Sequence, residues 1–410
     1  MISVREAQLK ILDSIRPLPA EGRGLLEVLG YVLAEDVCSD MDVPPFDNSS
    51  MDGYAIISAD VASASRERPV SLEIIDDLPA GYVSGKVVGR RQAIRIMTGA
   101  ALPAGADGVI IVENTERSGD RVHVIGPIKV GENIRRSGED LKKGELVLPS
   151  DTLIRPQEMG VLASMGKAQV KVFRRPKVAL ISTGDELTPL GGEVKPGKIR
   201  DSNRYSLWGS VIEAGGYPID LGIARDKAEV MEAKFREGLD KADVLITSAG
   251  VSVGDYDLVK TVLSKFGEIN YWKVSMRPGK PQTFGMAGSK PIFGLPGNPV
   301  SAMIVFEIMV RPALLKMAGR AKLFRPRFRA ILEENITNYT DRDNYMRGQI
   351  ALKDGLYYAR TTGPQGSNIL RSMVLANGLI IVPASVKEVK AGGEVDTELF
   401  GYPETMEEPY

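Results

Sequence analysis

The spacing of apolar residues changes character along the chain and divides it into regions. Apolar side chains near helical spacing predict a helix over residues 1–16, and a second helix is expected over 20–34. Residues 43–145 are rich in Gly and Pro, with short apolar runs between turn signals, which is typical of a β-rich domain. Strands are expected there at 54–57, 93–96, 108–112 and 122–125.

From about residue 176, compact apolar strands alternate with segments of helical periodicity. The expected strands lie at 178–181, 219–223, 244–247 and 292–295, and the expected helices at 201–214, 227–240, 256–265 and 299–317. Such alternation indicates a mostly parallel sheet covered by helices on both faces. Ser202 is a possible N-cap, and Asn298 followed by Pro299 fits the start of the last helix. Short strands at 328–332 and 379–382 predict a small C-terminal β domain.

Composition narrows the chemistry that these elements can support. The chain has 52 basic and 53 acidic residues, so its net charge of -1 gives no broad field and nucleic acid is not an expected partner. Because Cys38 and His123 are the one Cys and the one His, an internal disulfide and a structural zinc site are excluded. His123 lies in an alternating apolar run, which favours a strand position over a catalytic base.

Targeting and membrane signals are weak in this sequence. Residues 1–7 lack the apolar region of a signal peptide. The longest apolar stretch, residues 300–310, contains Glu307 and is too short to span a bilayer. We therefore expect a cytoplasmic protein that does not enter a membrane.

Three predicted strand ends are followed by glycine-containing loops with hydroxyls or carboxylates, at 182–186, 247–257 and 294–299. Ligands of open α/β sheets bind beyond the carboxyl ends of the strands, and glycine lets the backbone approach a phosphate closely. A tight turn alone explains any single loop equally well, but three such loops in one domain favour a ligand site. None matches a P-loop or a dinucleotide fingerprint, which disfavours an NTPase or an NAD dehydrogenase.

Charged residues accompany these loops. Glu186, Asp226 and Asp257 fall at predicted strand ends or in the loops after them, where carboxylates near a phosphate recruit Mg²⁺; helix capping is the simpler alternative for Asp226. Within 272–281, strand alternation places Lys273, Ser275 and Arg277 on one face, together with Lys280 nearby. Such a basic segment suits a polyanion, and a solvated edge strand is the alternative.

Several sequence motifs occur along the chain in an order that is specific to one protein family. They lie at 44–55 (Pro-Pro-Phe-Asp-Asn-Ser-Ser-Met-Asp-Gly-Tyr-Ala), 95–100, 135–140 and in the three loops. The chain resembles the molybdopterin molybdenumtransferases, the MoeA family, whose eukaryotic relatives include the gephyrin E domain. The resemblance covers essentially the whole chain.

This resemblance implies a multidomain α/β fold. It combines a MogA-like three-layer αβα domain, whose sheet is mostly parallel, with a β-rich insertion domain, a small linking domain and a C-terminal β-barrel-like domain. The implied boundaries are 1–17 for an N-terminal helix packed on the αβα domain, 18–42 with 146–175 for the linking domain, 43–145 for the β-rich domain, 176–322 for the αβα domain and 323–410 for the C-terminal domain.

The resemblance also implies an activity. Family members insert molybdate into adenylylated molybdopterin, release AMP and form molybdenum cofactor, with Mg²⁺ required. They are homodimers, and the molybdopterin adenylyltransferase is an expected partner. Because the sulfurs of the cofactor ligate the metal, the protein needs no Cys or His of its own.

Site residues follow by motif. The expected catalytic residues are Asp52, Thr98, Asp140, Glu186, Lys273 and Arg277, the last standing where many relatives have Lys. The expected substrate-binding residues are Gly184, Ser248, Gly250, Ser252, Lys280, Pro296, Gly297 and Pro299. Arg347 and Ser367 would bind molybdate, and Asp226 and Asp257 would hold Mg²⁺.

Three other functions remain open at this point. An adenylyltransferase would make the adenylylated pterin, but it would not need the regions at 43–145 and 323–410. A non-catalytic scaffold is disfavoured by the intact set of carboxylates and cations. Insertion of tungstate in place of molybdate is not distinguished by the sequence, since the two oxyanions are nearly isosteric.

Overall fold

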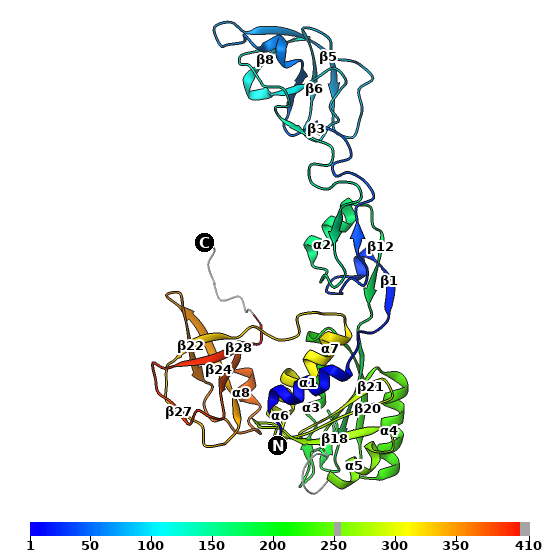
Figure 1. The fold of residues 1–410 in the computed structure, drawn as a ribbon, viewed down its shortest axis with the longest axis vertical. Helices are drawn as coiled ribbons and strands as arrows, with labels where there is room; N and C mark the ends of the chain where they lie inside the picture. Colours follow the sequence, from blue (N-terminus) through cyan, green and yellow to red (C-terminus); the bar gives the residue numbers. More distant parts are fainter. Residues whose placement is uncertain (250–255, 402–410) are drawn as a thin grey trace. The chain divides into compact units, whose positions relative to one another are not determined.

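The computed structural model describes residues 1–249 and 256–401 (Figure 1). The chain forms two compact units. The larger unit comprises Met1–Arg23, Gly30–Ala34 and Lys171–Tyr410, and the smaller unit comprises Gly24–Leu29 and Glu35–Val170. Among the described residues, no helix is long and apolar enough to cross a membrane.

A six-stranded sheet forms the centre of the larger unit. Its strands run in the order β16 (Tyr217–Ala224), β13 (Lys177–Thr183), β17 (Val244–Ser248), β21 (Lys290–Leu295), β20 (Pro281–Ala287) and β18 (Glu268–Lys273). The first four strands are mutually parallel, and β20 and β18 add antiparallel pairs at one edge. This order confirms the expectation of a mostly parallel sheet.

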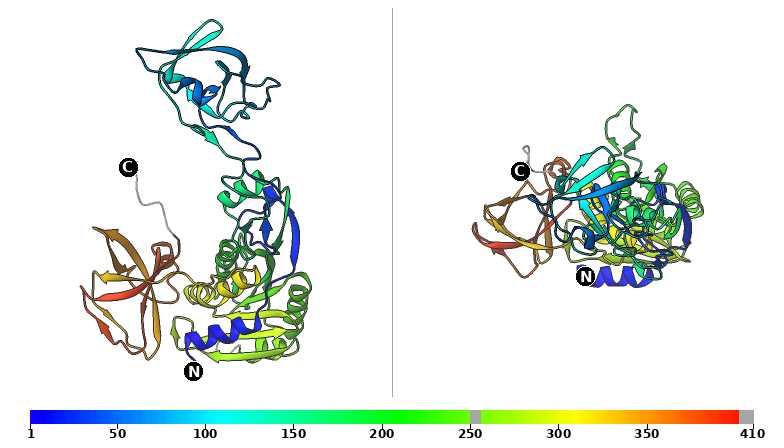
Figure 2. Two further views of the ribbon diagram at one scale, coloured as in Figure 1. Left: turned by 45° about the horizontal axis from the view of Figure 1, so that its top comes forward. Right: turned by 90° about the horizontal axis from the view of Figure 1, so that it is seen from above.

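Helices cover both faces of this sheet, as Figures 1 and 2 show. They are α1 (Val4–Ser14), α3 (Asn203–Glu213), α4 (Ala228–Lys241), α5 (Tyr256–Leu263), α6 (Pro299–Val305) and α7 (Arg311–Met317). Leu180 and Ile246 belong to a buried cluster with residues of α1, α3, α6 and α7. Their neighbours Ala179 and Leu245 belong to a second cluster with α4 and α5. Alternate residues of the strands therefore face the two sets of helices, and helices, sheet and helices form three layers.

The helix expected over 299–317 is interrupted by a π-helical turn, Phe306–Val310, between α6 and α7. Pro312 lies just after this turn. A proline lacks the N–H for an i→i−4 bond, and its ring clashes with the carbonyl four residues earlier. The wider turn accommodates Pro312 without ending the helical segment.

The helix expected over 20–34 is wrong. The structure has a strand, β1 (Ala20–Gly24), followed by a single 3₁₀ turn, η1 (Leu25–Glu27). Glycines at 22 and 24 carry the highest helix cost among ordinary residues, and Gly30 has φ of +75°, which a helix does not allow. The helical spacing of the apolar residues did not show that these glycines oppose a helix.

The C-terminal part of the larger unit is a closed barrel of five strands. Its strands are β24 (Asp343–Lys353), β25 (Leu356–Thr361), β22 (Phe328–Leu332), β28 (Glu394–Leu399) and β26 (Gly378–Val382), and the β24–β26 pairing closes it. The short elements β19 (Met276–Arg277), α8 (Arg371–Val374), β23 (Ile336–Thr337) and β27 (Glu388–Val389) accompany it. The predicted C-terminal β domain is thus confirmed as barrel-like.

The smaller unit is rich in short strands. One sheet has the order β7 (Gly108–Ile111), β4 (Gly53–Ile56), β6 (Gln92–Ile96), β5 (Val70–Leu78), β9 (Arg121–Val124) and β8 (Thr115–Ser118). Two-stranded pairs join β3 (Asn48–Ser49) to β10 (Ile134–Arg135) and β2 (Val37–Cys38) to β11 (Leu146–Leu148), and α2 spans Pro156–Ser164. His123 pairs with Ser71 and Glu116 inside the sheet, which confirms its strand position.

Glu158 stabilises the start of α2, and its effect should depend on pH. Its carboxylate accepts bonds from Arg155 Nη2 at 2.6 Å and from the Arg155 N–H at 2.8 Å. The Arg155 side chain is the main cause that lowers the pKa of Glu158 from 4.5 to about 2. A lowered folded pKa means stability present above the unfolded pKa and lost as pH falls through the folded one.

We therefore expect Glu158→Gln to lower the free energy of unfolding by about 1 kcal/mol at pH 7. The difference should shrink between pH 4.5 and 2. Urea unfolding of the full chain at several pH values measures it, with exposed Glu116→Gln as the control. A difference that stays constant down to pH 2 would contradict this role.

Candidate functional site

A cleft of about 600 Å³ opens at the carboxyl ends of the parallel strands in the larger unit. Its lining includes Glu186, Ser248, Pro296, Gly297 and Pro299, all predicted from the sequence. Segment 199–203 and Asn368 also line it. The described parts of the three glycine-containing loops therefore meet in one place, as expected for the carboxyl ends of neighbouring parallel strands.

Glu186 is held by the loop that follows β13. Gly184 has φ of +138°, and a Cβ added there would lie 2.3 Å from Glu186 Oε2. A side chain at position 184 would meet both backbone strain and a steric clash with this carboxylate. The lack of a side chain at Gly184 therefore leaves room for the carboxylate of Glu186, an exposed residue of the cleft lining.

Asp226 pairs with Asp185, a residue that the sequence analysis did not single out. Asp226 Oδ2 accepts the Asp185 N–H at 3.0 Å, and Asp185 Oδ1 accepts the Asp226 N–H at 3.4 Å. No group of three or more His, Cys, Asp or Glu among the described residues could hold a metal ion. Two carboxylates fit Mg²⁺ when substrate phosphate and water supply the other ligands.

Lys273 and Arg277 lie in different sheets. Lys273 ends β18 opposite Pro281, a residue of the cleft, whereas Arg277 lies in β19 and pairs with Asn344 of the barrel. The expectation that alternation places Lys273, Ser275 and Arg277 on one strand face is wrong. The chain leaves one sheet after Lys273 and enters the other at β19, so one strand period does not run through the segment.

Arg347 is buried on the outer face of β24, with 1% of its surface exposed, because it alternates with Met346 and Ile350 of the barrel core. Its Nε donates to Ser372 Oγ at 3.0 Å, and its Nη2 donates to the Gly366 carbonyl at 3.1 Å. Burial lowers the pKa of Arg347 to about 10, and the positive charge of Arg277 adds to the effect. Among the described residues Arg347 forms no ion pair with a carboxylate, so its charge is uncompensated.

The loop beside Arg347 borders the cleft. The Ser367 carbonyl accepts the Val300 N–H at 3.1 Å, and Val300 lies in the first turn of α6. The next residue, Asn368, lines the cleft itself. Lys280, also predicted for the site, is exposed and directly precedes Pro281 in the cleft lining.

Asp52, Thr98 and Asp140 belong to the smaller unit. Asp52 Oδ1 accepts both the Thr98 N–H and the Thr98 hydroxyl at 2.8 Å. These bonds, the backbone one first, hold the pKa of Asp52 below its ordinary value. Asp140 is exposed, and its N–H donates to the Val43 carbonyl at 3.1 Å. The structure thus joins Asp52 to Thr98 directly.

Gly250, Ser252 and the side chain of Asp257 lie outside the described residues. The structure also adds residues that the sequence analysis missed. Asn203 Nδ2 donates to the Gly297 carbonyl at 2.7 Å and so holds one cleft loop against another. Asp201 accepts the Ser182 hydroxyl at 2.9 Å.

The polar run at 199–203 was the available signal for these residues, but it was considered only for helix capping. Neither Ser202 nor Asn298 makes a side-chain capping bond, although Pro299 does start α6 as expected. The Arg204 N–H instead meets Asp201 Oδ1 at 3.3 Å. Ser202 and Asn298 therefore stand at the N-cap positions of α3 and α6 as expected, but without the side-chain bond of a cap.

Three family models match the chain in sequence order. They are the MoeA N-terminal region (domain I and II) at residues 2–166, a probable molybdopterin binding domain at residues 179–316, and the MoeA C-terminal region (domain IV) at residues 329–400. The second model covers the strands and loops that form the cleft, and the third covers the barrel with Arg347.

Curated relatives and a solved structure match over almost the full length. The molybdopterin molybdenumtransferase of Haemophilus influenzae is 36% identical, covering 98% of this chain and 99% of its own. That of Bacillus subtilis is 36% identical, covering 97% of this chain and 94% of its own. The crystal structure of a molybdopterin biosynthesis MoeA protein from Pyrococcus horikoshii has a TM-score of 0.83 at 32% identity, covering 98% of this chain and 100% of that chain.

Proposed function

Because the chain belongs to the molybdopterin molybdenumtransferase family, a family of enzymes, we propose that it inserts molybdate into adenylylated molybdopterin and releases AMP. The observation that carries this proposal is the buried charge of Arg347, which no carboxylate of the described residues compensates. Arg347 bonds to Gly366 in the loop whose Asn368 lines the cleft. Uncompensated buried cations are costly, and an anionic ligand offsets that cost. Molybdate, a tetrahedral dianion, suits guanidinium and hydroxyl donors.

The proposed reaction joins two sites. The two dithiolene sulfurs of the substrate bond to molybdenum, while two thiol protons and one molybdate oxygen leave as water. A second water cleaves the phosphoanhydride and AMP departs. Arg347, Arg277 and Ser367 bind the oxyanion in this proposal, and Lys273 and Lys280 beside Pro281 face the substrate phosphates. Bound Mg²⁺ would neutralise phosphate charge during the cleavage.

The partners proposed here follow the same chemistry. The substrate is adenylylated molybdopterin, and the adenylyltransferase that makes it is the proposed donor. We also propose a homodimer.

Purified protein mixed with adenylylated molybdopterin, molybdate and Mg²⁺ should release one AMP per molybdenum retained. AMP formation that needs ATP and free molybdopterin, without any need for molybdate, would contradict insertion and support an adenylyltransferase.

Asp226 is the described residue through which the proposed Mg²⁺ requirement is tested. Asp226→Asn should raise the Mg²⁺ concentration for half-maximal AMP release by roughly tenfold or more, because one of two carboxylate ligands is neutralised. The rate at saturating Mg²⁺ should fall less. Asp240→Asn removes a charge of α4 that is also exposed and should leave the titration unchanged. An unaltered Mg²⁺ titration in Asp226→Asn would exclude this site.

A further inference from the structure

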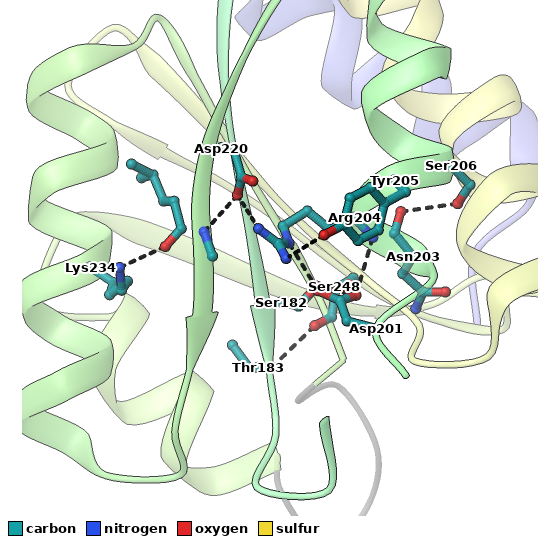
Figure 3. A network of polar contacts seen from close by, with 12 residues as sticks. Ser182, Thr183, Asp201, Asn203, Arg204, Tyr205, Ser206, Asp220, Lys234 and Ser248 are labelled. Atoms are coloured by element: carbon teal, nitrogen blue, oxygen red, sulfur yellow. Dashed lines mark hydrogen bonds and ion pairs between the residues drawn. The ribbon is translucent and has the colours of Figure 1, made fainter. Parts of the chain in front are cut away.

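Three polar side chains at the wall of the cleft, those of Asp201, Ser182 and Ser248, form a connected chain of hydrogen bonds (Figure 3). The Ser182 hydroxyl lies 2.9 Å from Asp201 Oδ1 and 3.2 Å from the Ser248 hydroxyl. Ser182 and Ser248 are 0% and 2% exposed, and Ser248 lies in the wall of the cleft. The hydrogen bonds therefore connect the buried carboxylate of Asp201 to Ser248, a residue that faces the space that a ligand would occupy.

Asp201 fixes the direction of every hydrogen in this chain. Arg204 Nε donates to Asp201 Oδ2 at 2.9 Å in a buried ion pair, so Asp201 is an ionised carboxylate and can only accept. The pKa of Arg204 is raised: burial alone would lower it, but the bonds to Asp220 and Asp201 outweigh burial. Ser182 must then donate its single hydrogen to Asp201.

The contact between the two hydroxyls therefore takes its hydrogen from Ser248. With that hydrogen directed at Ser182, the Ser248 oxygen can offer the cleft only lone pairs. A phosphate oxygen, which also offers lone pairs, would be repelled at this position. A ligand N–H or O–H would be attracted, because it supplies the missing hydrogen.

We propose that Ser248 accepts a hydrogen bond from the amino edge of a substrate heterocycle, and that Asp201 and Ser182 set this polarity as positioning residues. The inference rests on the proposed function, whose substrate carries two such rings, a pterin and an adenine. Two of the three ionisable residues in the described cleft lining, Glu186 and Asp201, are acceptors that suit a ligand donor; the third, Arg200, gives one of its donors to the Gly192 carbonyl at 2.9 Å.

Ligand pairs that reverse the amino group test the proposal and identify the ring. AMP is compared with inosine monophosphate, and 6-hydroxymethylpterin with 6-hydroxymethyllumazine, since each second member carries an oxo acceptor in place of the amino donor. We expect wild-type protein to prefer the amino member of one pair by about tenfold in dissociation constant. Ser248→Ala should abolish that preference, while Ser202→Ala, a change in the same wall, should keep it.

Asp201→Asn should reverse the donor and acceptor order of the hydrogen bonds through Ser182 and Ser248. Arg204 donates to both oxygens of Asp201, from Nε to Oδ2 at 2.9 Å and from its backbone N–H to Oδ1 at 3.3 Å. We expect the Asn carbonyl oxygen to keep the shorter bond from the charged guanidinium, which leaves the amide N–H group facing Ser182. Ser182 then donates to Ser248, and Ser248 donates into the cleft. The preferred member of the sensitive pair should switch to the oxo form, and the double variant Asp201→Asn/Ser248→Ala should show no preference.

Equal binding within both pairs, or a preference that survives in Ser248→Ala, would overturn the proposal. This comparison does not depend on folding of Asp201→Asn, which a thermal melt checks separately. If wild-type protein inserts molybdate normally while the pairs are not discriminated, the polarity inference alone fails. If wild-type protein does not bind adenylylated molybdopterin, the proposed function fails.

Discussion

Replacing Arg347 by Gln is expected to lower molybdenum insertion by about 100-fold, the typical effect of losing one preorganised donor to a developing or bound anion. The loss should appear mainly as a higher molybdate concentration for half-maximal rate. Arg347→Lys should recover only part of the affinity, because an ammonium group cannot reproduce the planar pair of donors. Initial rates of AMP release at several molybdate concentrations measure both variants.

Because Arg347 is buried, its role can also be tested by the thermal stability of the protein. Arg347 is 1% exposed and has no carboxylate partner within residues 1–249 and 256–401, so an oxyanion that binds beside its guanidinium should stabilise the folded state. Molybdate and tungstate should raise the thermal midpoint of the wild-type protein but not of Arg347→Gln. Because the folded pKa is about 10, Arg347 stays protonated below that pH, and its contribution to molybdate binding should not vary between pH 6 and 8.

Arg329→Gln is a matched control for this series. Arg329 lies on the outside of the same barrel, 58% exposed in its side chain, and pairs with Glu394 and Asp396. Exposed pairs contribute little to stability, so molybdate dependence should stay unchanged. A normal molybdate titration in Arg347→Gln would remove Arg347 from the oxyanion site.

Gly184→Ala is expected to lower AMP release by about 100-fold, because it displaces Glu186 from the cleft wall. The native φ of +138° is rarely adopted by alanine, and the new methyl group would meet Glu186 Oε2 at 2.3 Å. Glu186→Gln should cause a loss of similar size, and adding it to Gly184→Ala should cost little more, since both act through one carboxylate.

Gly191→Ala separates backbone strain from displacement of Glu186. Gly191 also has a positive φ, +82°, but an added Cβ there would have nothing within 4 Å. We expect a modest loss of stability and a rate of AMP release near that of the wild-type protein. If Gly184→Ala and Gly191→Ala behaved alike, the carboxylate of Glu186 would not be the group that matters.

Much of the αβα region could be predicted from sequence because its strands are short, apolar and regularly spaced. Residues 178–181 and 244–247 fall inside β13 and β17, and one rule about sheet edges then brings their following loops together. The same approach failed at 20–34, where the low helix propensity of the glycines outweighed the helical spacing of the apolar residues. It also failed at 272–281, where the chain changes sheets and strand alternation no longer applies.

The candidate site was predictable only where a residue belongs to a recognised loop. Glu186 and Pro296 were found in this way, whereas Asp201 was missed because its role depends on burial and on its bond to Ser182. Arg347 was assigned by resemblance, and only the structure shows that no carboxylate among the described residues pairs with it. Such pairings depend on tertiary neighbours that local sequence does not specify.

The position of a bound oxyanion tests the account most directly. Crystals soaked with tungstate, or with molybdate, give anomalous scattering that locates the metal without reference to activity. We expect a peak within hydrogen-bonding distance of Arg347, Arg277 or Ser367, beside the cleft, and its loss in Arg347→Gln. A fully occupied peak elsewhere, with none at these residues, would contradict it.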